Sequence, residues 1–254
     1  MKVGAMDNVL AKPWTELFEE AARLGFDGVE LDLRAETYLD SEVWSAEGRK
    51  ALAARSRASG AEIASVCMAS VARLMTGRDT HAQGVKAVAD LRRYCDELGA
   101  GVILFPMSKQ DNQSEEEAFG LWRDGLRAAL ADSAGSQTRV GMESVGRTGR
   151  SAQQSLEMIE AVGSPHLGVY YDVGNADYQG FDPVAEIAQL GPHIFQCHVK
   201  EIGAEMGEGK LDFPELIGAL KGAGLDGYLV LETPAGDDPA ANAARNLAFI
   251  RGLL

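Results

Sequence analysis

Four side chains that could hold a metal ion stand at the carboxyl ends of four successive apolar segments. They are Glu143, Asp172, His198 and Glu232. Three carboxylates brought together would repel one another and raise their own pKa values, and a divalent cation would remove that repulsion. Carboxylate oxygens with one imidazole nitrogen suit Mn²⁺, which we expect, and also Mg²⁺, Co²⁺ and Zn²⁺. The four residues therefore predict a site for one divalent metal ion.

The convergence of these side chains depends on the strands that carry them. Side chains alternate between the two faces of a β-strand. Glu143 lies on the face opposite to Val140 and Met142, and His198 shares its face with Gln196, whereas its direct neighbours are apolar. The polar residues are thus expected to point into a barrel mouth, and the apolar residues to face covering helices.

Eight β-type segments alternate with segments of helical periodicity along the 254 residues. Such an unbroken alternation predicts a single (β/α)8 TIM barrel, whose active site lies at the C-terminal ends of the strands. A doubly wound sheet fits less well, because no G-x-G-x-x-G turn follows the first strand. We expect residues 1–254 to form one domain. The expected strands are Lys2–Met6, Gly28–Leu33, Glu62–Ala69, Gly101–Phe105, Arg139–Glu143, Leu167–Asp172, Ile194–Val199 and Tyr228–Glu232.

Local signals place the starts and ends of the helices between these strands. Ser151 with Gln154 forms the pattern of a capping box, and Asp182 followed by Pro183 is typical of an N-cap and first helical position. Glycines that are expected to end helices are Gly25, Gly60, Gly99 and Gly224.

The bulk composition narrows the class of protein. The net charge is −14, which argues against nucleic acid as a partner, because such binders usually carry excess positive charge. The three cysteines are far apart and form no disulfide pattern, which favours a reducing compartment. Neither a signal peptide nor a run of apolar residues long enough for a membrane span is present. We therefore expect a cytoplasmic protein without a membrane partner.

Several motifs carry a resemblance that spans nearly the whole chain. They are Gly25–Leu31, Met142-Glu143, Tyr171–Asn175, His198–Glu201 and Gly207–Phe213. With these motifs the sequence resembles the xylose-isomerase-like superfamily of sugar isomerases and epimerases. The resemblance implies a small carbohydrate or polyol as substrate and a homo-oligomer, either a dimer or a tetramer. It also implies that Glu143, Asp172, His198 and Glu232 bind the metal.

In ketose 3-epimerases of this superfamily, the two glutamates of the metal set also move the proton. By resemblance, Glu143 and Glu232 would be the catalytic residues, one taking a proton from the carbon beside the metal-bound carbonyl and the other returning it to the opposite face of an enediolate. The chain departs from those epimerases at Asn175, where they usually carry histidine, and in residues 202–205, which contain no arginine. The resemblance thus specifies fold and metal more closely than substrate.

Other activities use the same barrel. The main alternative is a metal-dependent dehydratase of a keto-inositol or of a dehydroshikimate-type substrate, which would form an enolate and then expel a hydroxyl group. An abasic-site endonuclease would need several more histidines than the four present. A barrel that only binds its ligand would not need to keep all four metal ligands.

Five further residues are candidates for contact with the substrate. Lys200 shares its face with His198, and Glu30 points into the barrel, where it could orient the substrate or form a buried ion pair. Arg147 follows Glu143 closely and could bind an anionic group. The remaining candidates are Asn175 and Glu208.

Overall fold

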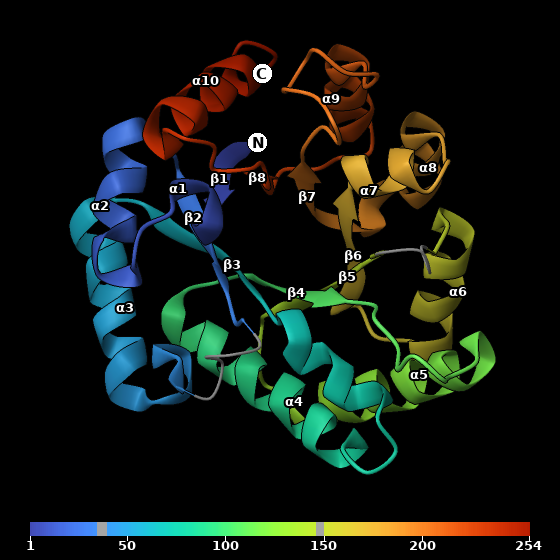
Figure 1. Ribbon diagram of the computed structural model, residues 1–254. Coiled ribbons are helices and arrows are strands. Elements are labelled where there is room, and N and C mark those ends of the chain that lie inside the picture. Colours follow the sequence, from blue (N-terminus) through green and yellow to red (C-terminus); the bar gives the residue numbers. More distant parts are fainter. Residues whose placement is uncertain (35–39, 146–149) are drawn as a thin grey trace.

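The eight strands close into a parallel barrel in the computed structural model, which describes residues 1–34, 40–145 and 150–254 (Figure 1). Neighbouring strands pair in sequence order, and β1 closes the ring by pairing with β8 from Lys2↔Tyr228 to Ala5↔Leu231. The prediction of a single (β/α)8 TIM barrel is confirmed. The strands are β1 Lys2–Met6, β2 Gly28–Asp32, β3 Glu62–Cys67, β4 Val102–Pro106, β5 Arg139–Glu143, β6 Leu167–Asp172, β7 Ile194–Val199 and β8 Tyr228–Leu231.

Helices surround the barrel and cover its outer face (Figure 1). Short elements at the barrel ends accompany the long covering helices. The described helices are α1 Asp7–Leu10, α2 Trp14–Leu24, η2 Glu42–Trp44, α3 Ala46–Ser59, η3 Ala69–Thr76, α4 His81–Leu98, α5 Glu115–Asp132, α6 Ala152–Val162, α7 Val173–Tyr178, α8 Pro183–Leu190, η5 Gly191–His193, α9 Phe213–Gly222 and α10 Pro239–Arg251.

Four strands differ slightly from the prediction in their bounds. The strands β2, β3 and β8 end one or two residues earlier than expected, and β4 lies one residue later. The chain keeps single ladder-like bonds past two of these ends, from Leu33 N to Cys67 O (2.9 Å) and from Glu232 N to Val199 O (3.3 Å). The chain therefore stays extended for one residue beyond the ends of β2 and β8, although regular strand pairing has stopped there.

The predicted helix signals form the expected caps. Ser151 and Gln154 make both bonds of the capping box, and Asp182 caps α8 with Pro183 in its first turn. Gly25, like Gly60 and Gly99, adopts the left-handed conformation directly after its helix. The end of α9 differs, because Ala223 is its C-cap and left-handed Gly224 follows one residue later.

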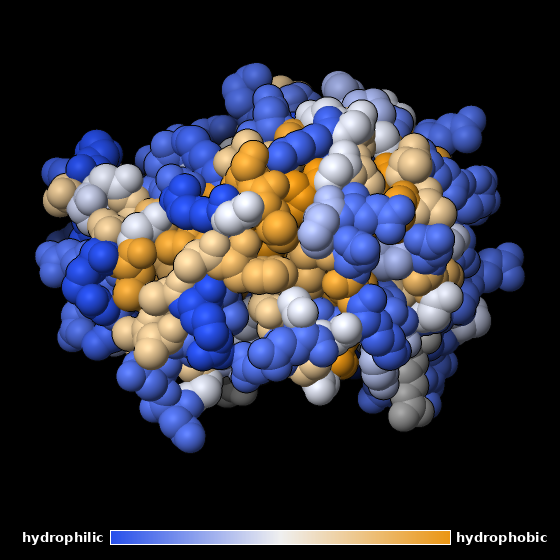
Figure 2. Space-filling model, turned by 90° about the horizontal axis from the view of Figure 1, so that it is seen from above, coloured by the Kyte–Doolittle hydropathy of each residue, from blue (hydrophilic) through white to orange (hydrophobic). Residues whose placement is uncertain are grey.

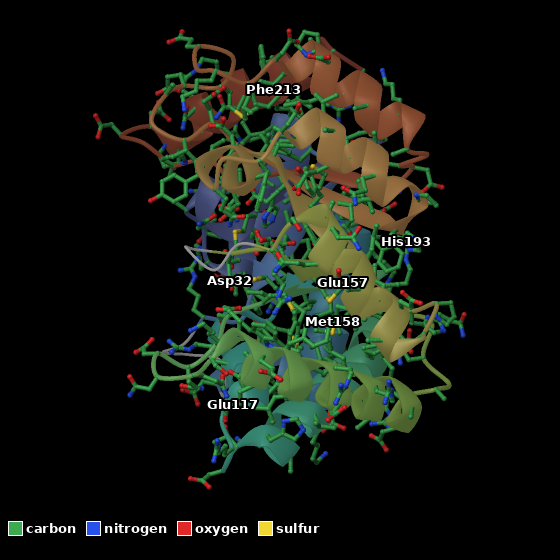
Figure 3. All side chains as sticks on the ribbon, turned by 90° about the vertical axis from the view of Figure 1, so that its right-hand side faces the viewer. Asp32, Glu117, Glu157, Met158, His193 and Phe213 are labelled. Carbon is green, nitrogen blue, oxygen red and sulfur yellow. The ribbon has the colours of Figure 1, made fainter. Side chains whose placement is uncertain are left out.

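The two ends of the barrel differ in their side chains. Asp32 and His193 lie at opposite ends when the molecule is viewed from the side (Figure 3). Asp32 ends β2, and His193 precedes β7. The candidate metal ligands stand with Asp32 at the carboxyl ends of strands, so the chemistry is concentrated at that mouth. His193 directly precedes β7, so it lies at the end where the strands enter the barrel.

One face of the surface carries an apolar area across its middle. It is visible from the side on which α9 and α10 lie, and hydrophilic side chains surround it (Figure 2). Exposed apolar areas often mark interfaces between proteins. The expectation of a homo-oligomer nevertheless stays a prediction. Among the described residues, no helix combines the length and apolar character that crossing a bilayer would require.

Candidate metal centre

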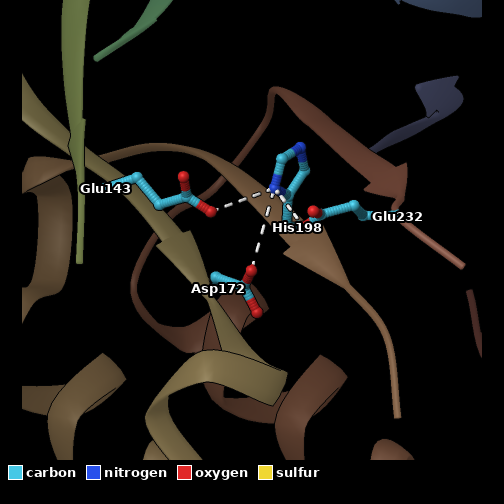
Figure 4. A group of neighbouring side chains, drawn as sticks. All are labelled: Glu143, Asp172, His198 and Glu232. Carbon is cyan, nitrogen blue, oxygen red and sulfur yellow. Dashed lines mark hydrogen bonds and ion pairs between the residues drawn. The ribbon is translucent and has the colours of Figure 1, made fainter. Parts of the chain in front are cut away.

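The barrel brings together the four residues that the sequence selects as metal ligands (Figure 4). Glu143, Asp172 and His198 belong to β5, β6 and β7, and Glu232 directly follows β8. One ligand atom from each lies within 4.8 Å of the others. His198 Nδ1 is 3.0 Å from Glu232 Oε2, 3.3 Å from Glu143 Oε1 and 3.8 Å from Asp172 Oδ2. Adjacent parallel strands thus place all four groups around one point.

Burial and mutual repulsion give these groups unusual acid–base properties. Burial raises the pKa of Glu143 to about 8 despite its contact with His198, and burial likewise raises the pKa of Asp172. Burial also acts to raise the pKa of Glu232, but His198 and Lys200 outweigh it and hold that pKa well below its usual range. Burial would lower the pKa of His198, but nearby carboxylates raise it well above its ordinary value. Burial and neighbouring charge thus act in different directions: they favour the neutral forms of Glu143 and Asp172 and the charged forms of Glu232 and His198.

The donor set fits a divalent cation. Asp172 Oδ2 is buried and has no hydrogen-bond partner. Lys200 Nζ lies 2.8 Å from this oxygen as an ion pair. A buried carboxylate is costly unless positive charge lies beside it, and here one lysine pairs with both Asp172 and Glu232. A cation at the centre of the four ligands would add positive charge, and hard oxygen donors with one imidazole are appropriate for such an ion.

Lys200 lies against the cluster, as its position on the face of His198 predicts. Its Nζ is 2.7 Å from Glu232 Oε2, and its side chain is only 14% exposed. The stem packs on α7 at Gly174, where an added Cβ would come within 2.6 Å of Lys200 Cγ. The lysine is therefore the nearest positive charge to two of the candidate ligands, and its role toward a substrate remains a prediction.

Glu30 points into the barrel as predicted, but it lies beneath the cluster. It is 0% exposed, and its Oε1 is 2.9 Å from His198 Nε2. Its Oε2 accepts a hydrogen bond of 2.5 Å from Ser65 Oγ. Of the two interpretations drawn from the sequence, these contacts favour a buried ion pair over direct contact with a substrate.

The other candidates for substrate contact occupy different positions. Asn175 lies in the first turn of α7, and its Nδ2 donates to Ser144 O (3.2 Å) and Glu143 Oε1 (3.4 Å), which brings it to the cluster. Glu208 is exposed in the segment between β7 and α9. The prediction for Arg147 falls outside the described residues. Contact of these residues with a substrate stays a prediction.

A polar group at the ends of β1 and β2 was missed by the sequence reasoning. Asp7 Oδ2 accepts from Trp14 Nε1 (2.7 Å), and Asp7 Oδ1 pairs with Arg34 Nη2 (3.0 Å). These residues line a cavity of about 290 Å³ together with Asp32. Burial, followed by the charges of Asp7 and Glu30, raises the pKa of Asp32 to about 7. Asp7 and Asp32 could have been found, because they too stand at the carboxyl ends of strands.

A second cavity opens at the mouth beside Glu232. Its volume is about 380 Å³, and the loops after β7 and β8 form it with the start of α10. Glu201 lines it and holds the β7–α9 loop, because its Oε1 accepts from the backbone N of Lys210 (2.8 Å) and Leu211 (3.2 Å). Four acidic side chains line the cavity, Glu201, Glu205, Asp237 and Asp238, and its cationic residue Arg245 is paired with Glu205 (2.6 Å).

An eight-stranded parallel barrel with an acidic, histidine-containing cluster at its mouth defines the class of this protein. The model of the family described as "Xylose isomerase-like TIM barrel" matches residues 18–253. The chain therefore belongs to this family, as the resemblance in its motifs predicts.

Individual relatives agree with this assignment. The chain is 27% identical over 225 residues to "Putative L-ribulose-5-phosphate 3-epimerase SgbU" of Escherichia coli, covering 85% of this chain and 78% of the relative. Among solved structures, D-psicose 3-epimerase matches with a TM-score of 0.86 at 16% identity, covering 100% of this chain and 99% of the other. The 3-keto-D-glucoside 4-epimerase YcjR from E. coli matches with a TM-score of 0.82 at 20% identity over 99% of each chain. At these identities the solved structures support the fold.

Proposed function

We propose that this protein is a divalent-metal-dependent sugar isomerase or epimerase that acts on a ketose or related polyol ketone by moving a proton beside its carbonyl group. The observation that carries the proposal is the arrangement of the two glutamates. Glu143 and Glu232 approach the centre of the cluster from opposite sides (Figure 4). The relatives named as sugar epimerases support the same reaction class.

In this proposal, Glu143, Asp172, His198 and Glu232 hold the metal ion, with Mn²⁺ as the expected ion. When bound there, a divalent cation supplies Lewis-acid polarisation of the substrate carbonyl and offsets the negative charge that develops on deprotonation. Glu143 and Glu232 act as general base and general acid on the two faces of the planar intermediate. They exchange these roles in the reverse direction.

The surrounding residues bind and orient the substrate. Lys200 Nζ, between Asp172 and Glu232, is placed to donate a hydrogen bond to a substrate oxygen at the metal centre. Asn175 holds Glu143 through Nδ2 and fixes the direction of that carboxylate. Asp7 and Asp32, at the other side of the mouth, offer hydrogen-bond partners for hydroxyl groups farther along the substrate.

The charge of the mouth favours a substrate without a phosphate group. TIM barrels that bind phosphates often do so with the loops after strands seven and eight. In this protein, the cavity at that position is lined by four acidic side chains and one arginine that is already paired. A phosphate dianion would be repelled there, whereas neutral hydroxyl groups could bind to the same carboxylates.

Exchange of substrate protons with solvent deuterium tests the proposal. The purified protein with Mn²⁺ is incubated with ketoses, ketose phosphates, inososes and dehydroshikimate, and NMR follows the hydrogen on the carbon beside the carbonyl. We expect exchange and a product of unchanged mass with an unphosphorylated ketose or polyol ketone. A product that has lost water would instead identify a dehydratase.

Variants separate catalysis from folding. Glu143→Gln and Glu232→Gln should each lower the rate of product formation by about 10²–10⁴-fold, the usual contribution of general acid–base catalysis, although the glutamate that remains can still exchange the proton on its own face. Glu186→Gln is the matched control, because Glu186 is a buried glutamate that caps Ala152 N and accepts from Tyr171 away from the cluster. Near-wild-type product formation in either of the first two variants would refute the two-carboxylate assignment.

A further inference from the structure

The imidazole of His198 is held by carboxylates on both of its nitrogens. Nδ1 faces the three carboxylates of the metal cluster at 3.0–3.8 Å. Nε2 is 2.9 Å from Glu30 Oε1, on the side of the ring away from the cluster. Glu30 and His198 are 0% and 1% exposed. The contact between Glu30 and His198 is therefore shielded from solvent.

Glu30 is itself fixed by a buried polar network. Its Oε2 accepts a short hydrogen bond of 2.5 Å from Ser65 Oγ. Ser65 Oγ in turn accepts from Gln196 Nε2 at 3.4 Å and lies 3.4 Å from Tyr170 OH. Ser65 thus holds Oε2 of Glu30, and Oε1 faces His198 Nε2.

The ring has little freedom to turn. Tyr170 packs on His198 edge to face, with ring centroids 4.6 Å apart. A flip of the imidazole would place a carbon atom opposite Glu30 and another opposite the cluster. A carboxylate at Nε2 can only accept, so of the two neutral forms of histidine, the forms that can bind a metal ion, it favours the one with its proton on Nε2 and its lone pair on Nδ1.

We propose that Glu30 is a positioning residue of the metal centre, which binds the Nε2–H of His198 and thereby presents the Nδ1 lone pair to the cation. This inference rests on the proposed metal-dependent function. Glu30 acts through His198 and does not touch the substrate. Carboxylate partners of this kind orient metal-binding histidines and raise their basicity, and their loss commonly weakens metal binding by about 10–100-fold.

Two substitutions of Glu30 separate its charge from its hydrogen bond. Glu30→Gln keeps the volume and an acceptor oxygen but removes the charge. Glu30→Met keeps a similar volume and removes the acceptor, which leaves the Nε2–H of His198 without a partner. Ser65→Ala loosens Glu30 without altering it, and Glu186→Gln is the control for loss of a buried glutamate elsewhere.

The first readout is the dissociation constant for Mn²⁺ alone and for Zn²⁺ alone, measured by calorimetry on metal-free protein. We expect binding to weaken by about 10–100-fold in Glu30→Met, by less in Glu30→Gln and Ser65→Ala, and by less than about twofold in Glu186→Gln. Glu30→Gln and Ser65→Ala change the volume of the interior little, so their metal affinities still test the role of Glu30 if Glu30→Met does not fold.

The second readout needs no variant. Nitrogen-15 NMR of histidine-labelled, Zn²⁺-loaded protein reports which ring nitrogen of His198 binds the metal. We expect coordination through Nδ1 and a slowly exchanging proton on Nε2. Coordination through Nε2, or unchanged metal affinity in both Glu30 variants, would overturn the role of Glu30 and leave the metal site intact. Failure of the wild type to bind either metal would overturn the proposed function, and the role of Glu30 with it.

Discussion

Replacement of Lys200 by methionine should destabilise the metal-free protein far more than the metal-loaded protein. Lys200 Nζ lies 2.7 Å from Glu232 Oε2 and 2.8 Å from Asp172 Oδ2. Asp172 is buried, and the Glu232 side chain is 28% exposed. Without a metal ion, Lys200 balances these carboxylates together with His198, and methionine at position 200 would fill the space of the lysine without its charge.

The size of the effect follows from the burial of the pair. Removal of one partner of a buried ion pair costs about 3–5 kcal/mol, because the other charge stays buried and unpaired. The partial exposure of Glu232 places the expected loss near the lower limit, at about 3 kcal/mol. For a chain of this length, about 3 kcal/mol lowers Tm by roughly 6–12 °C. A bound cation would take over the role of the lysine and restore most of this loss.

Thermal unfolding of the metal-free and the Mn²⁺-saturated proteins measures both effects. We expect the deficit of Lys200→Met to fall by more than half when Mn²⁺ is present, because the ion binds the folded state and stabilises it. Lys86→Met is the control, since Lys86 forms an exposed ion pair with Asp90 on α4 and its loss should change stability by less than about 1 kcal/mol. An equal deficit with and without Mn²⁺ would refute the interpretation of Lys200 as the countercharge of the cluster.

Three further substitutions test the structure around the site. Asp32→Asn tests the raised pKa of the Asp32 carboxyl, which is about 7. Because the folded protein favours the neutral form of this carboxyl, wild-type stability is greatest below about pH 4 and falls as the pH rises through about 7. The shift from 3.8 sets an upper limit of about 4 kcal/mol on this loss of folding free energy. We expect Asp32→Asn to be more stable than the wild type at about pH 8 but not at about pH 4, and parallel curves of stability against pH would contradict this. Asp182→Ala removes the cap that accepts from Val184 N (3.0 Å) and Ala185 N (3.2 Å) and should cost about 1 kcal/mol in denaturant unfolding, whereas Asp182→Asn should cost little. Gly84→Ala should lower the free energy of unfolding by about 1–3 kcal/mol, because the new Cβ would lie 2.6 Å from Met75 Cα in η3. This clash outweighs the better helix propensity of alanine. An unchanged unfolding midpoint would show that η3 moves aside freely.

The fold could be predicted because its signals are local. Each strand is a short apolar run, and turn or capping residues such as Ser151 and Gly25 separate it from its helices. In a closed parallel barrel, the carboxyl ends of all strands meet at one mouth, and this holds whatever the contacts between distant residues are. Glu143, Asp172 and His198 could therefore be grouped before their distances were known.

The contacts of the site could not be predicted in the same way. Glu30 and His198 are 168 residues apart, and their contact depends on the register of the strands between them. The alternation of faces shows that both point inward, but not that one lies against the other. The same holds for Lys200, whose place between Asp172 and Glu232 is set by the packing of its stem on Gly174.

Crystals grown with Mn²⁺ and measured by anomalous diffraction test the central claim most directly. We predict one strong peak at the barrel mouth, within about 2.5 Å of His198 Nδ1 and of carboxylate oxygens from Glu143, Asp172 and Glu232. A map without a peak between these four groups, or with manganese bound elsewhere while they point apart, would contradict the account.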